Sequence, residues 1–340
     1  MAEKKRAGRN RTICLQEDER SRLLARCVKI DELDQAHIPR DLTILGDMLQ
    51  AVKELPDHFV DLLVVDPPYN LDKTFGTKKF NRMDSAKYEE FTRRWIEGVM
   101  HTLKETATVY VCCDWKTSLV IGRVLCDYFY VHNRITWQRE KGRGALTNWK
   151  NGMEDIWFAT VSKKYTFNVE AVKQRRKVIA PYRENGKPKD WEETEHGNYR
   201  DTFPSNFWDD ISIPYWSMPE NTDHPTQKPE KLIAKLILAS SNEREMIFDP
   251  FLGSGTTSVV AKKLNRHYVG IEWEEEYCAL TEKRLDLAEK DSSIQGYSGG
   301  VFWERNTLAQ QKKSKNGDKN KEKVLFSQES LLKDDGEVTK

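Results

Sequence analysis

Between residues 61 and 70 the chain reads Asp61-Leu62-Leu63-Val64-Val65-Asp66-Pro67-Pro68-Tyr69-Asn70. An unbroken apolar run that ends in two valines is typical of a strand buried on both faces, as in a parallel sheet. The two prolines end that strand, because they donate no backbone hydrogen bond and hold the residue before them in extended geometry. The stretch therefore predicts a stiff corner at the carboxyl end of a buried strand, which is where open α/β sheets bind their ligands.

The side chains on this corner suit a flat group that carries an NH2. Asp66 and the carbonyl of Pro67 offer acceptors for its two hydrogens, and the ring of Tyr69 offers a face on which it can stack. From these residues alone, a strand followed by a plain proline turn is an equally good interpretation.

A second stretch lies far downstream and reads Asp249-Pro250-Phe251-Leu252-Gly253-Ser254-Gly255-Thr256-Thr257. It stands between a short apolar strand and a predicted helix, and its two glycines let the backbone turn tightly beside a ligand. The next predicted strand ends in Glu272. That acid follows Gly253 at the spacing of about 20 residues at which an acidic side chain reaches a ribose hydroxyl in nucleotide-binding βαβ units.

Both stretches together resemble the DNA amino-group methyltransferases that use S-adenosylmethionine. The corner resembles their catalytic Asp-Pro-Pro-Tyr motif and the glycine turn resembles their cofactor loop. Because the corner precedes the loop, the chain resembles the permuted beta group, of the adenine-N6 type, known from bacterial restriction-modification systems and orphan methylases. A third block, His224-Pro225-Thr226-Gln227-Lys228-Pro229, resembles the segment before the cofactor loop in that group. The resemblance covers roughly residues 40 to 290.

The resemblance implies an α/β fold of the Rossmann-like methyltransferase type, with a doubly wound, mostly parallel sheet and an inserted target-recognition region. It also implies three segments. These are a basic N-terminal arm at 1–40, a catalytic domain at 41–290 that holds the recognition region at about 139–222, and a polar tail at 291–340 that we expect to be disordered.

The resemblance also implies a role for each matching residue. Asp66, Pro67 and Tyr69 are the candidate catalytic residues, and Pro68 and Asn70 are candidates for the base pocket. S-adenosylmethionine is the implied cofactor. Its candidate binding residues are Asp47, Thr226, Gln227, Lys228, Asp249, Phe251, Gly253, Ser254, Gly255, Thr256 and Glu272. For Asp47, an N-cap on the following helix is an equal interpretation.

Periodicity predicts the elements that carry these motifs. Strands are expected at 42–45, 61–65, 108–113, 131–137, 153–158, 246–248 and 267–271. Helices are expected at 17–27, 48–55, 88–103, 116–128 and 258–264. The polar segment 71–85 is expected to be a mobile loop over the substrate.

The middle of the chain concentrates positive charge. From Arg134 to Lys189 there are 14 Lys and Arg residues against five Asp and Glu residues, a local net charge of +9 in a chain whose total is +1. Such a concentration suits phosphate neutralisation, although a solvated charged surface is the alternative. The candidate DNA contacts are Arg139, Lys141, Arg143, Lys173, Arg175, Arg176 and Lys177.

Composition excludes several classes of protein. Charged residues make up 32% of the 340-residue chain and mean hydropathy is −0.74, so no segment approaches the ~20 apolar residues of a membrane span. The six cysteines form no C-x-x-C pair and have no histidine at zinc spacing, so we expect no metal site and free thiols. The N-terminus lacks an apolar signal segment, so secretion is not expected, and the resemblance implies a bacterial, DNA-associated protein of the cytoplasm.

Double-stranded DNA is the implied partner, and the family allows a cognate restriction endonuclease and a homodimer. Four alternatives stay open. The same chemistry on the N4 amine of cytosine is the nearest, followed by methylation of RNA or of a protein amide and by a non-catalytic DNA-binding protein of the same fold. A nicotinamide enzyme fits less well, because the turn lacks the G-x-G-x-x-G pattern.

Overall fold

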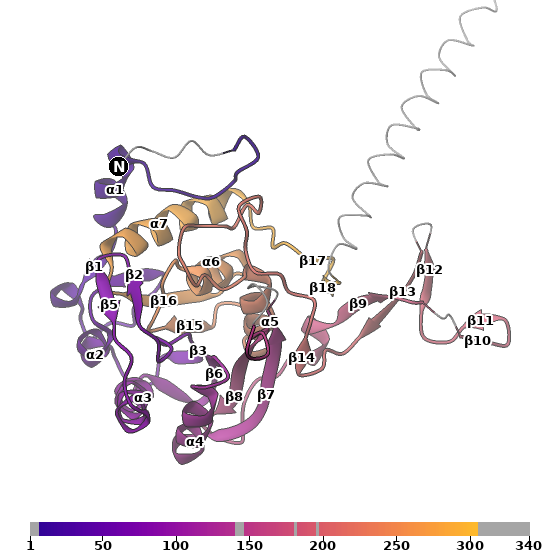
Figure 1. The fold of residues 1–340 in the computed structure, drawn as a ribbon, viewed down its shortest axis with the longest axis horizontal. Coiled ribbons are helices and arrows are strands. Elements are labelled where there is room, and N and C mark those ends of the chain that lie inside the picture. Colours follow the sequence, from indigo (N-terminus) through magenta and orange to yellow (C-terminus); the bar gives the residue numbers. More distant parts are fainter. Residues whose placement is uncertain (1–6, 140–145, 180–181, 195–196, 305–340) are drawn as a thin grey trace, which may run out of the picture.

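A mostly parallel sheet forms the centre of the molecule in the computed structural model, which describes residues 7–139, 146–179, 182–194 and 197–304. The strands follow the order β1-β2-β16-β15-β3-β6-β8-β7-β14, and β8 alone runs against the others (Figure 1). Their bounds are β1 Val28–Lys29, β2 Leu42–Leu45, β16 His267–Glu272, β15 Met246–Asp249, β3 Val60–Val65, β6 Leu103–Cys113, β8 Met153–Thr160, β7 Tyr130–Gln138 and β14 Phe207–Trp208. The predicted α/β fold with a mostly parallel sheet is confirmed.

Strand β3 is buried on both faces, as its apolar run predicted. Leu63 and Val65 pack into the core on one side of the sheet, and Leu62 and Val64 pack into the core on the other. Side chains alternate between the two faces of a strand, so a run without polar breaks is what a strand covered on both sides requires.

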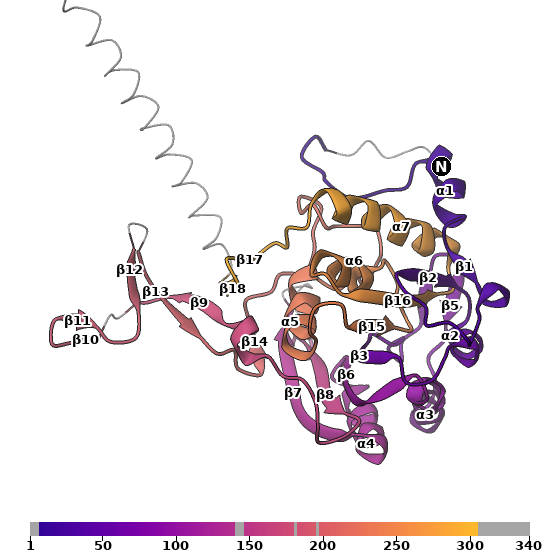
Figure 2. The same cartoon turned by 180° about the vertical axis from the view of Figure 1, so that it is seen from behind.

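Helices cover both faces of this sheet (Figures 1 and 2). One core contains side chains of α2, α3 and α4, and the other contains side chains of α5, α6 and α7. The bounds are α2 Met48–Ala51, α3 Ser85–Met100, α4 Ser118–Tyr128, α5 Glu230–Ser240, α6 Thr256–Lys263 and α7 Glu275–Lys290. All 11 residues of α5 are buried, so this helix lies inside the protein rather than on its surface.

From residue 17 onward, the segment expected to be an N-terminal arm is part of the folded body. Helix α1 (Glu17–Leu24) packs against α7 and buries Leu23 completely, while β1 extends the central sheet. The expectation that the fold begins at residue 41 is therefore wrong. Before α1, an isolated parallel bridge joins Ile13 to Thr222.

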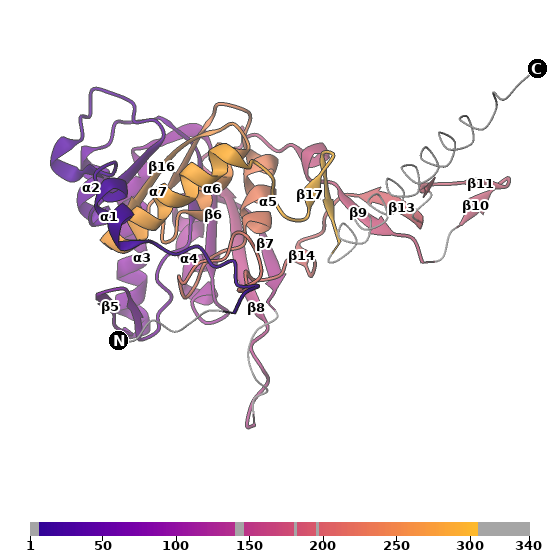
Figure 3. The same cartoon turned by 90° about the horizontal axis from the view of Figure 1, so that it is seen from above.

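A second sheet extends beyond β14 (Figures 1 and 3). It has five strands in the order β12-β13-β9-β18-β17, and the hairpin β10–β11 lies at its far end. The bounds are β9 Gln174–Lys177, β10 Arg183–Glu184, β11 Lys187–Pro188, β12 Glu192–Thr194, β13 Gly197–Thr202, β17 Tyr297–Ser298 and β18 Val301–Trp303. We call this part the second lobe.

The expected disordered tail from residue 291 is wrong for residues 297–303, because they form β17 and β18. Strand β18 pairs with β9, and Phe302 is completely buried. Only a short apolar group interrupts this polar segment, and its burial depends on an open edge of β9 that the sequence does not reveal. Residues 305–340 lie outside the described residues.

The expected loop at 71–85 is also more regular than predicted. Strands β4 (Lys73–Phe75) and β5 (Lys78–Phe80) form an antiparallel hairpin in it. At the turn, the backbone N–H and the hydroxyl of Thr77 both donate to Glu274, at 3.0 and 2.8 Å. The hairpin is thereby attached to the segment just before α7.

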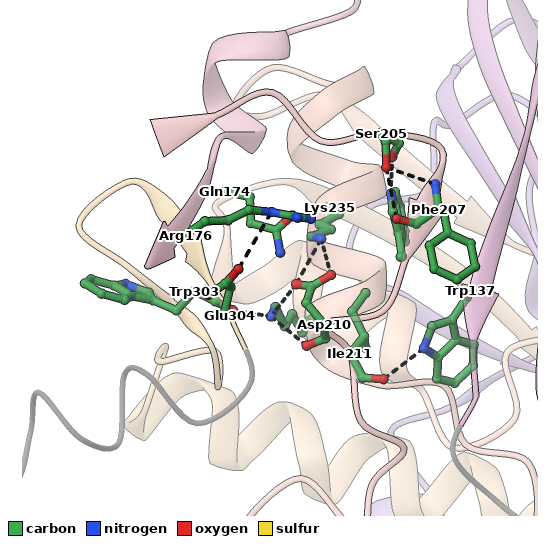
Figure 4. Close-up of polar contacts among 12 residues, drawn as sticks. Trp137, Gln174, Arg176, Ser205, Phe207, Asp210, Ile211, Lys235, Trp303 and Glu304 are labelled. Atoms are coloured by element: carbon green, nitrogen blue, oxygen red, sulfur yellow. Dashed lines mark hydrogen bonds and ion pairs between the residues drawn. The ribbon is translucent and has the colours of Figure 1, made fainter. Parts of the chain in front are cut away.

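A buried ion cluster joins α5 to the chain that returns from the second lobe (Figure 4). Lys235 Nζ lies 2.9 Å from Asp210 Oδ1, and Lys231 Nζ lies 2.5 Å from Asp210 Oδ2 and from the carbonyl oxygen of Trp303. The ammonium of Lys235 also lies 4.9 Å from the ring centroid of Trp208. One carboxylate thus serves two buried ammonium groups.

We expect Asp210→Asn to lower the free energy of unfolding by about 3–5 kcal/mol, because it leaves two buried ammonium groups without an anion. Urea unfolding at pH 7 measures this loss. Glu275→Gln is the control, because Glu275 pairs with Arg20 at 3.3 Å on the surface and such a pair contributes at most about 1 kcal/mol. Equal losses in the two variants would contradict the structural importance of the Asp210 cluster.

Candidate active site

One cleft opens at the carboxyl edge of the central sheet. Four adjacent strands, β2, β16, β15 and β3, point their carboxyl ends at this edge. Each contributes an acidic residue to the cleft, namely Asp47 after β2, Glu272 at the end of β16, Asp249 at the end of β15 and Asp66 after β3. Parallel strands bring their ends together, so residues from distant parts of the chain meet here.

The glycine turn forms one wall of the cleft. Gly253 has a φ of +57°, and its backbone N–H donates to Glu272 Oε2 at 2.8 Å. A Cβ added at Gly253 would lie 3.1 Å from His224 Nε2, and His224 also lines the cleft. The sequence predicted Gly253 and Glu272 as separate ligands, and the structure shows that Glu272 also fixes the turn.

Gly255 allows two helices to pack closely and does not form the wall of the cleft. Its φ is +78°, it begins α6, and a Cβ there would lie 2.5 Å from the side chain of Thr281 in α7. It is not among the residues that line the cleft in the described part of the chain. The sequence predicted Gly255 beside a ligand, and the structure instead shows it where α6 packs closely against α7.

Two carboxylates of the cleft are deeply buried. Asp249 accepts from the Phe251 N–H at 3.0 Å and from the Thr257 hydroxyl at 2.6 Å, while Glu272 Oε1 accepts from the Glu274 N–H at 2.8 Å. Burial raises the pKa of Asp249 to about 7 and that of Glu272 to about 7. Both groups therefore titrate near neutral pH, because burial disfavours the ionised form.

The remaining predicted cofactor residues also lie at the cleft. Thr226, Phe251, Ser254 and Thr256 line the cleft. Asp47 lines it too, and its carboxylate also accepts from the Leu49 N–H at 3.0 Å, so the N-cap interpretation is confirmed.

Gln227 reaches the cleft but directs its amide inward. Its Oε1 accepts from the backbone N–H and the hydroxyl of Thr222, at 2.9 and 2.7 Å, and its Nε2 donates to the carbonyl of Glu220 at 2.7 Å. These three bonds fix the segment that presents Lys228.

Lys228 contacts the proline corner. Its Nζ lies 2.6 Å from Asp66 Oδ2 and 3.5 Å from Glu154 Oε2, and 5.3 Å from the ring centroid of Tyr69. Burial lowers the pKa of Lys228, but Asp66 and Glu154 outweigh burial and raise that pKa above its usual value. The side chain is therefore an ammonium, and it lies against the carboxylate predicted to be catalytic.

The second oxygen of Asp66 is the open acceptor of the site. Among the described residues, Asp66 Oδ1 has no hydrogen-bond partner, although the atom is closed to solvent. A buried acceptor without a partner carries a desolvation cost of about 1–3 kcal/mol. Asp66 itself lines the cleft, so an oxygen without a protein partner is suited to accept a hydrogen from a ligand once the ligand reaches it.

Tyr69 is held by Glu154, which the sequence analysis did not identify as a site residue. The phenol donates to Glu154 Oε2 at 3.3 Å, and Glu154 Oε1 pairs with Arg139. Glu154 and Asp155 are adjacent acids near the start of strand β8, and two acids in a strand expected to be buried are the signal that could have found this site.

Pro67 and Pro68 line the cleft as predicted, and Asn70 does not. The Asn70 amide instead makes two bonds to the backbone of Met83, at 2.7 and 2.8 Å. A short polar side chain after a turn often bonds nearby backbone, and here it closes the loop that contains β4 and β5.

The predicted DNA-contact residues are not equally available. Arg139 pairs with Glu154, Lys173 lies 2.6 Å from Glu170, and Arg175 holds Asp201 through two bonds of 2.7 Å. Lys141 and Arg143 lie outside the described residues.

Arg176 and Lys177 occupy a hollow on the second lobe. Arg176 Nε lies 3.8 Å from Glu304 Oε1, and the side chain of Lys177 is exposed. The hollow is also lined by Tyr182, Lys189, Trp191 and Arg200. Basic and aromatic groups meet here beside the acids Asp190 and Glu304, and basic and aromatic side chains are the types that contact nucleic acid.

Comparison with known proteins places these features in a family. The family described as DNA methylase matches residues 60–283. The chain is 35% identical over 246 residues to the Type II methyltransferase M.HpaI of Haemophilus parainfluenzae, covering 72% of this chain and 73% of that protein. It is 33% identical over 261 residues to the DNA adenine methyltransferase YhdJ of Escherichia coli strain K12, covering 74% and 84%.

Solved structures share the fold. The cytosine-N4-specific PvuII DNA methyltransferase matches with a TM-score of 0.55 and 16% identity, covering 74% of this chain and 89% of that chain. M1.HpyAVI in its complex with SAM matches with a TM-score of 0.50 and 22% identity, covering 72% and 98%.

Proposed function

The chain belongs to the DNA methylase family, and on that premise we propose that it transfers a methyl group from S-adenosylmethionine to the N6 amine of an adenine in duplex DNA. The observation that carries the proposal is the buried, partnerless Oδ1 of Asp66 at the cleft that also holds the glycine turn. An acceptor for an amine hydrogen and a loop for the methyl donor thus share one space.

The residues of the cleft fit S-adenosylmethionine. At Gly253 a Cβ would enter the space beside His224, so the absent side chain leaves room where a ligand must approach the backbone. Asp47 and Glu272 offer acceptors for the hydroxyl and amino groups of a nucleoside, and Phe251 offers an apolar surface. When bound, the cofactor supplies an electrophilic methyl carbon on a sulfonium.

The corner activates the amine. Adenine N6 is a weak nucleophile because its lone pair is delocalised into the ring. Asp66 Oδ1 and the carbonyl of Pro67 accept its two hydrogens, draw the nitrogen toward tetrahedral geometry and localise the lone pair. Deprotonation before attack is not needed, since an ordinary carboxylate is far too weak a base for it, and positioning supplies much of the rate gain.

Tyr69 stacks against the target base after the base has left the DNA duplex. The amine is inaccessible inside a duplex, so the adenine must be flipped out of the stack. Stacking of the base on Tyr69 recovers about 1–3 kcal/mol of the unstacking cost. The hydrogen bond from the phenol to Glu154 fixes the orientation of the ring.

Adenine rather than cytosine is the target because two observations favour it. YhdJ, 33% identical to this chain, is named a DNA adenine methyltransferase, and Asp at position 66 resembles the adenine branch. Modification-sensitive sequencing of DNA from cells that express the chain tests the choice. N6-methyladenine at one sequence motif is expected, and N4-methylcytosine or no modification would overturn the proposal.

The proposal extends to partners and location. We include a cognate restriction endonuclease because M.HpaI is named a Type II methyltransferase, and we include a homodimer and a DNA-associated, cytoplasmic location on the family resemblance. The structure contributes one fact. No helix within the described residues has the length and apolar character that a membrane crossing demands.

The first functional prediction concerns the cofactor. Gly253→Ala should weaken S-adenosylmethionine binding about tenfold or more, a loss of roughly 1.4 kcal/mol or more, because the new Cβ occupies space beside His224 at the cleft. Calorimetry measures the affinity. Gly299→Ala is the matched control, since its φ of +61° carries the same strain and nothing lies within 4 Å. Equal affinity in both variants would place the cofactor elsewhere.

The second prediction separates chemistry from capture. Asp66→Ala should slow single-turnover methylation by roughly 10²–10⁴-fold, the usual contribution of a positioned proton acceptor, with little change in cofactor or DNA affinity. Tyr69→Ala should lose rate through poor capture of the flipped base, while Tyr69→Phe keeps the ring face and most of the rate. A fluorescent reporter of base flipping distinguishes these effects. A near wild-type rate for Asp66→Ala would refute the catalytic assignment.

The third prediction concerns DNA binding by the second lobe. Lys177→Ala should reduce the slope of log K against log salt by ~0.9, the value for one lost phosphate contact. Lys53→Ala is the control, because Lys53 is also exposed but follows α2, away from the second lobe. An unchanged slope in Lys177→Ala would make the basic run an ordinary solvated surface.

A further inference from the structure

One buried ammonium lies between two carboxylates at the base of the cleft. Lys228 is buried, with its Nζ 2.6 Å from Asp66 Oδ2 and 3.5 Å from Glu154 Oε2. The ammonium thus has a near anion and a farther one. The motif resemblance implies a cofactor contact for Lys228, whereas its ammonium contacts Asp66.

The two carboxylates have different second partners. Glu154 is held on both oxygens, by Arg139 at Oε1 and by the Tyr69 hydroxyl at Oε2. Asp66 is held only at Oδ2, and its Oδ1 is buried without a partner in the described part of the chain. Both oxygens of Glu154 are therefore occupied. Asp66, in contrast, has one oxygen bonded to Lys228 and one oxygen without a partner among the described residues.

We propose that Lys228 is a positioning residue that fixes Asp66 with Oδ1 toward the target amine and then transfers its ion pairing to Glu154 when Oδ1 takes the proton of the methylated amine. The inference rests on the proposed function and deepens it. Glu154 is the second positioning residue, because it supplies the anion that remains once Asp66 is neutral.

The step balances without any further reagent. The amine nitrogen gives its lone pair to the methyl carbon as that carbon's bond to sulfur breaks, and the bonding pair stays on sulfur as a neutral thioether. The nitrogen then carries one positive charge and passes one proton to Asp66 Oδ1. Asp66 becomes a neutral acid, and Lys228 retains a counter-ion in Glu154.

The physical reason for a second carboxylate is the burial of Lys228. An ammonium without an anion in a desolvated site costs several kcal/mol, so proton transfer to Asp66 would be opposed if Lys228 had no other partner. Glu154, already 3.5 Å away, removes that opposition. The ammonium also stops Oδ2 from competing with Oδ1 for the amine hydrogen.

The test compares variants by single-turnover methylation of duplex DNA, with cofactor and DNA affinities measured separately. Lys228→Met should reduce the transfer rate about 10²-fold, in the range of one lost electrostatic contact at a reacting centre, and should leave both affinities within threefold of wild type. Lys228→Arg keeps the charge and should recover most of the rate. Lys228→Gln keeps hydrogen bonding without charge and replaces the Met variant if that one fails to fold.

The coupling is read from a double-mutant cycle. Glu154→Gln alone should slow transfer about tenfold, and in the Lys228→Met background it should have almost no further effect, because its charge acts through Lys228 while the Gln oxygen can still accept from the Tyr69 hydroxyl. Effects that multiply independently would overturn the shared role of the two residues.

Lys235→Met is the matched control for loss of a buried lysine. Lys235 lies in α5 and contacts Asp210, which keeps Lys231 as a partner (Figure 4). It should lower stability and leave the transfer rate unchanged.

Three further results decide the proposal. A transfer rate for Lys228→Met within threefold of wild type would refute it. A loss confined to cofactor affinity would also refute it and return Lys228 to the cofactor site. If the wild-type protein methylates no DNA, the proposed function fails, whereas an active wild type with equally active Lys228 variants refutes only the inference.

Discussion

The contact between the Asp66 carboxylate and the Lys228 ammonium is the interaction on which the site depends. It joins residues 162 positions apart at 2.6 Å, between a buried lysine and a partly buried carboxylate. Two charges are acceptable there only because each compensates the other. The contact occupies one oxygen of Asp66, and the other has no partner among the described residues. A single ion pair therefore both balances the charge of Asp66 and orients its second oxygen.

The sheet makes this contact available. β3 and β15 are neighbours, and β16 and β2 follow on the same side, so the proline corner and the glycine turn end at one edge although they are far apart in sequence. Either motif order along the chain can produce the same edge, because the strand order rather than the chain order decides which ends meet. The second lobe meets this frame at the fully buried helix α5, which carries Lys231 and Lys235 of the Asp210 cluster and shares its core with Phe302 of β18.

The sequence predicted the features that follow from local rules. The apolar run of β3, the two prolines after it and the left-handed glycine of the cofactor turn each have a local physical cause, and the structure places all three as expected. The sequence did not predict features that depend on a distant partner. Glu154 belongs to the site only because β8 lies beside β6, Arg175 is occupied only because β13 carries Asp201 opposite it, and β18 is ordered only because β9 offers an edge.

The measurement that tests the account most directly is a crystal structure of the protein with duplex DNA and a non-reactive analogue of the cofactor. The account predicts a flipped adenine stacked on Tyr69, with N6 within about 3.2 Å of both Asp66 Oδ1 and the Pro67 carbonyl, and with Lys228 still on Asp66 Oδ2. A target base whose amine faces away from Asp66, or an Asp66 Oδ1 bonded to a protein group in the complex, would contradict it.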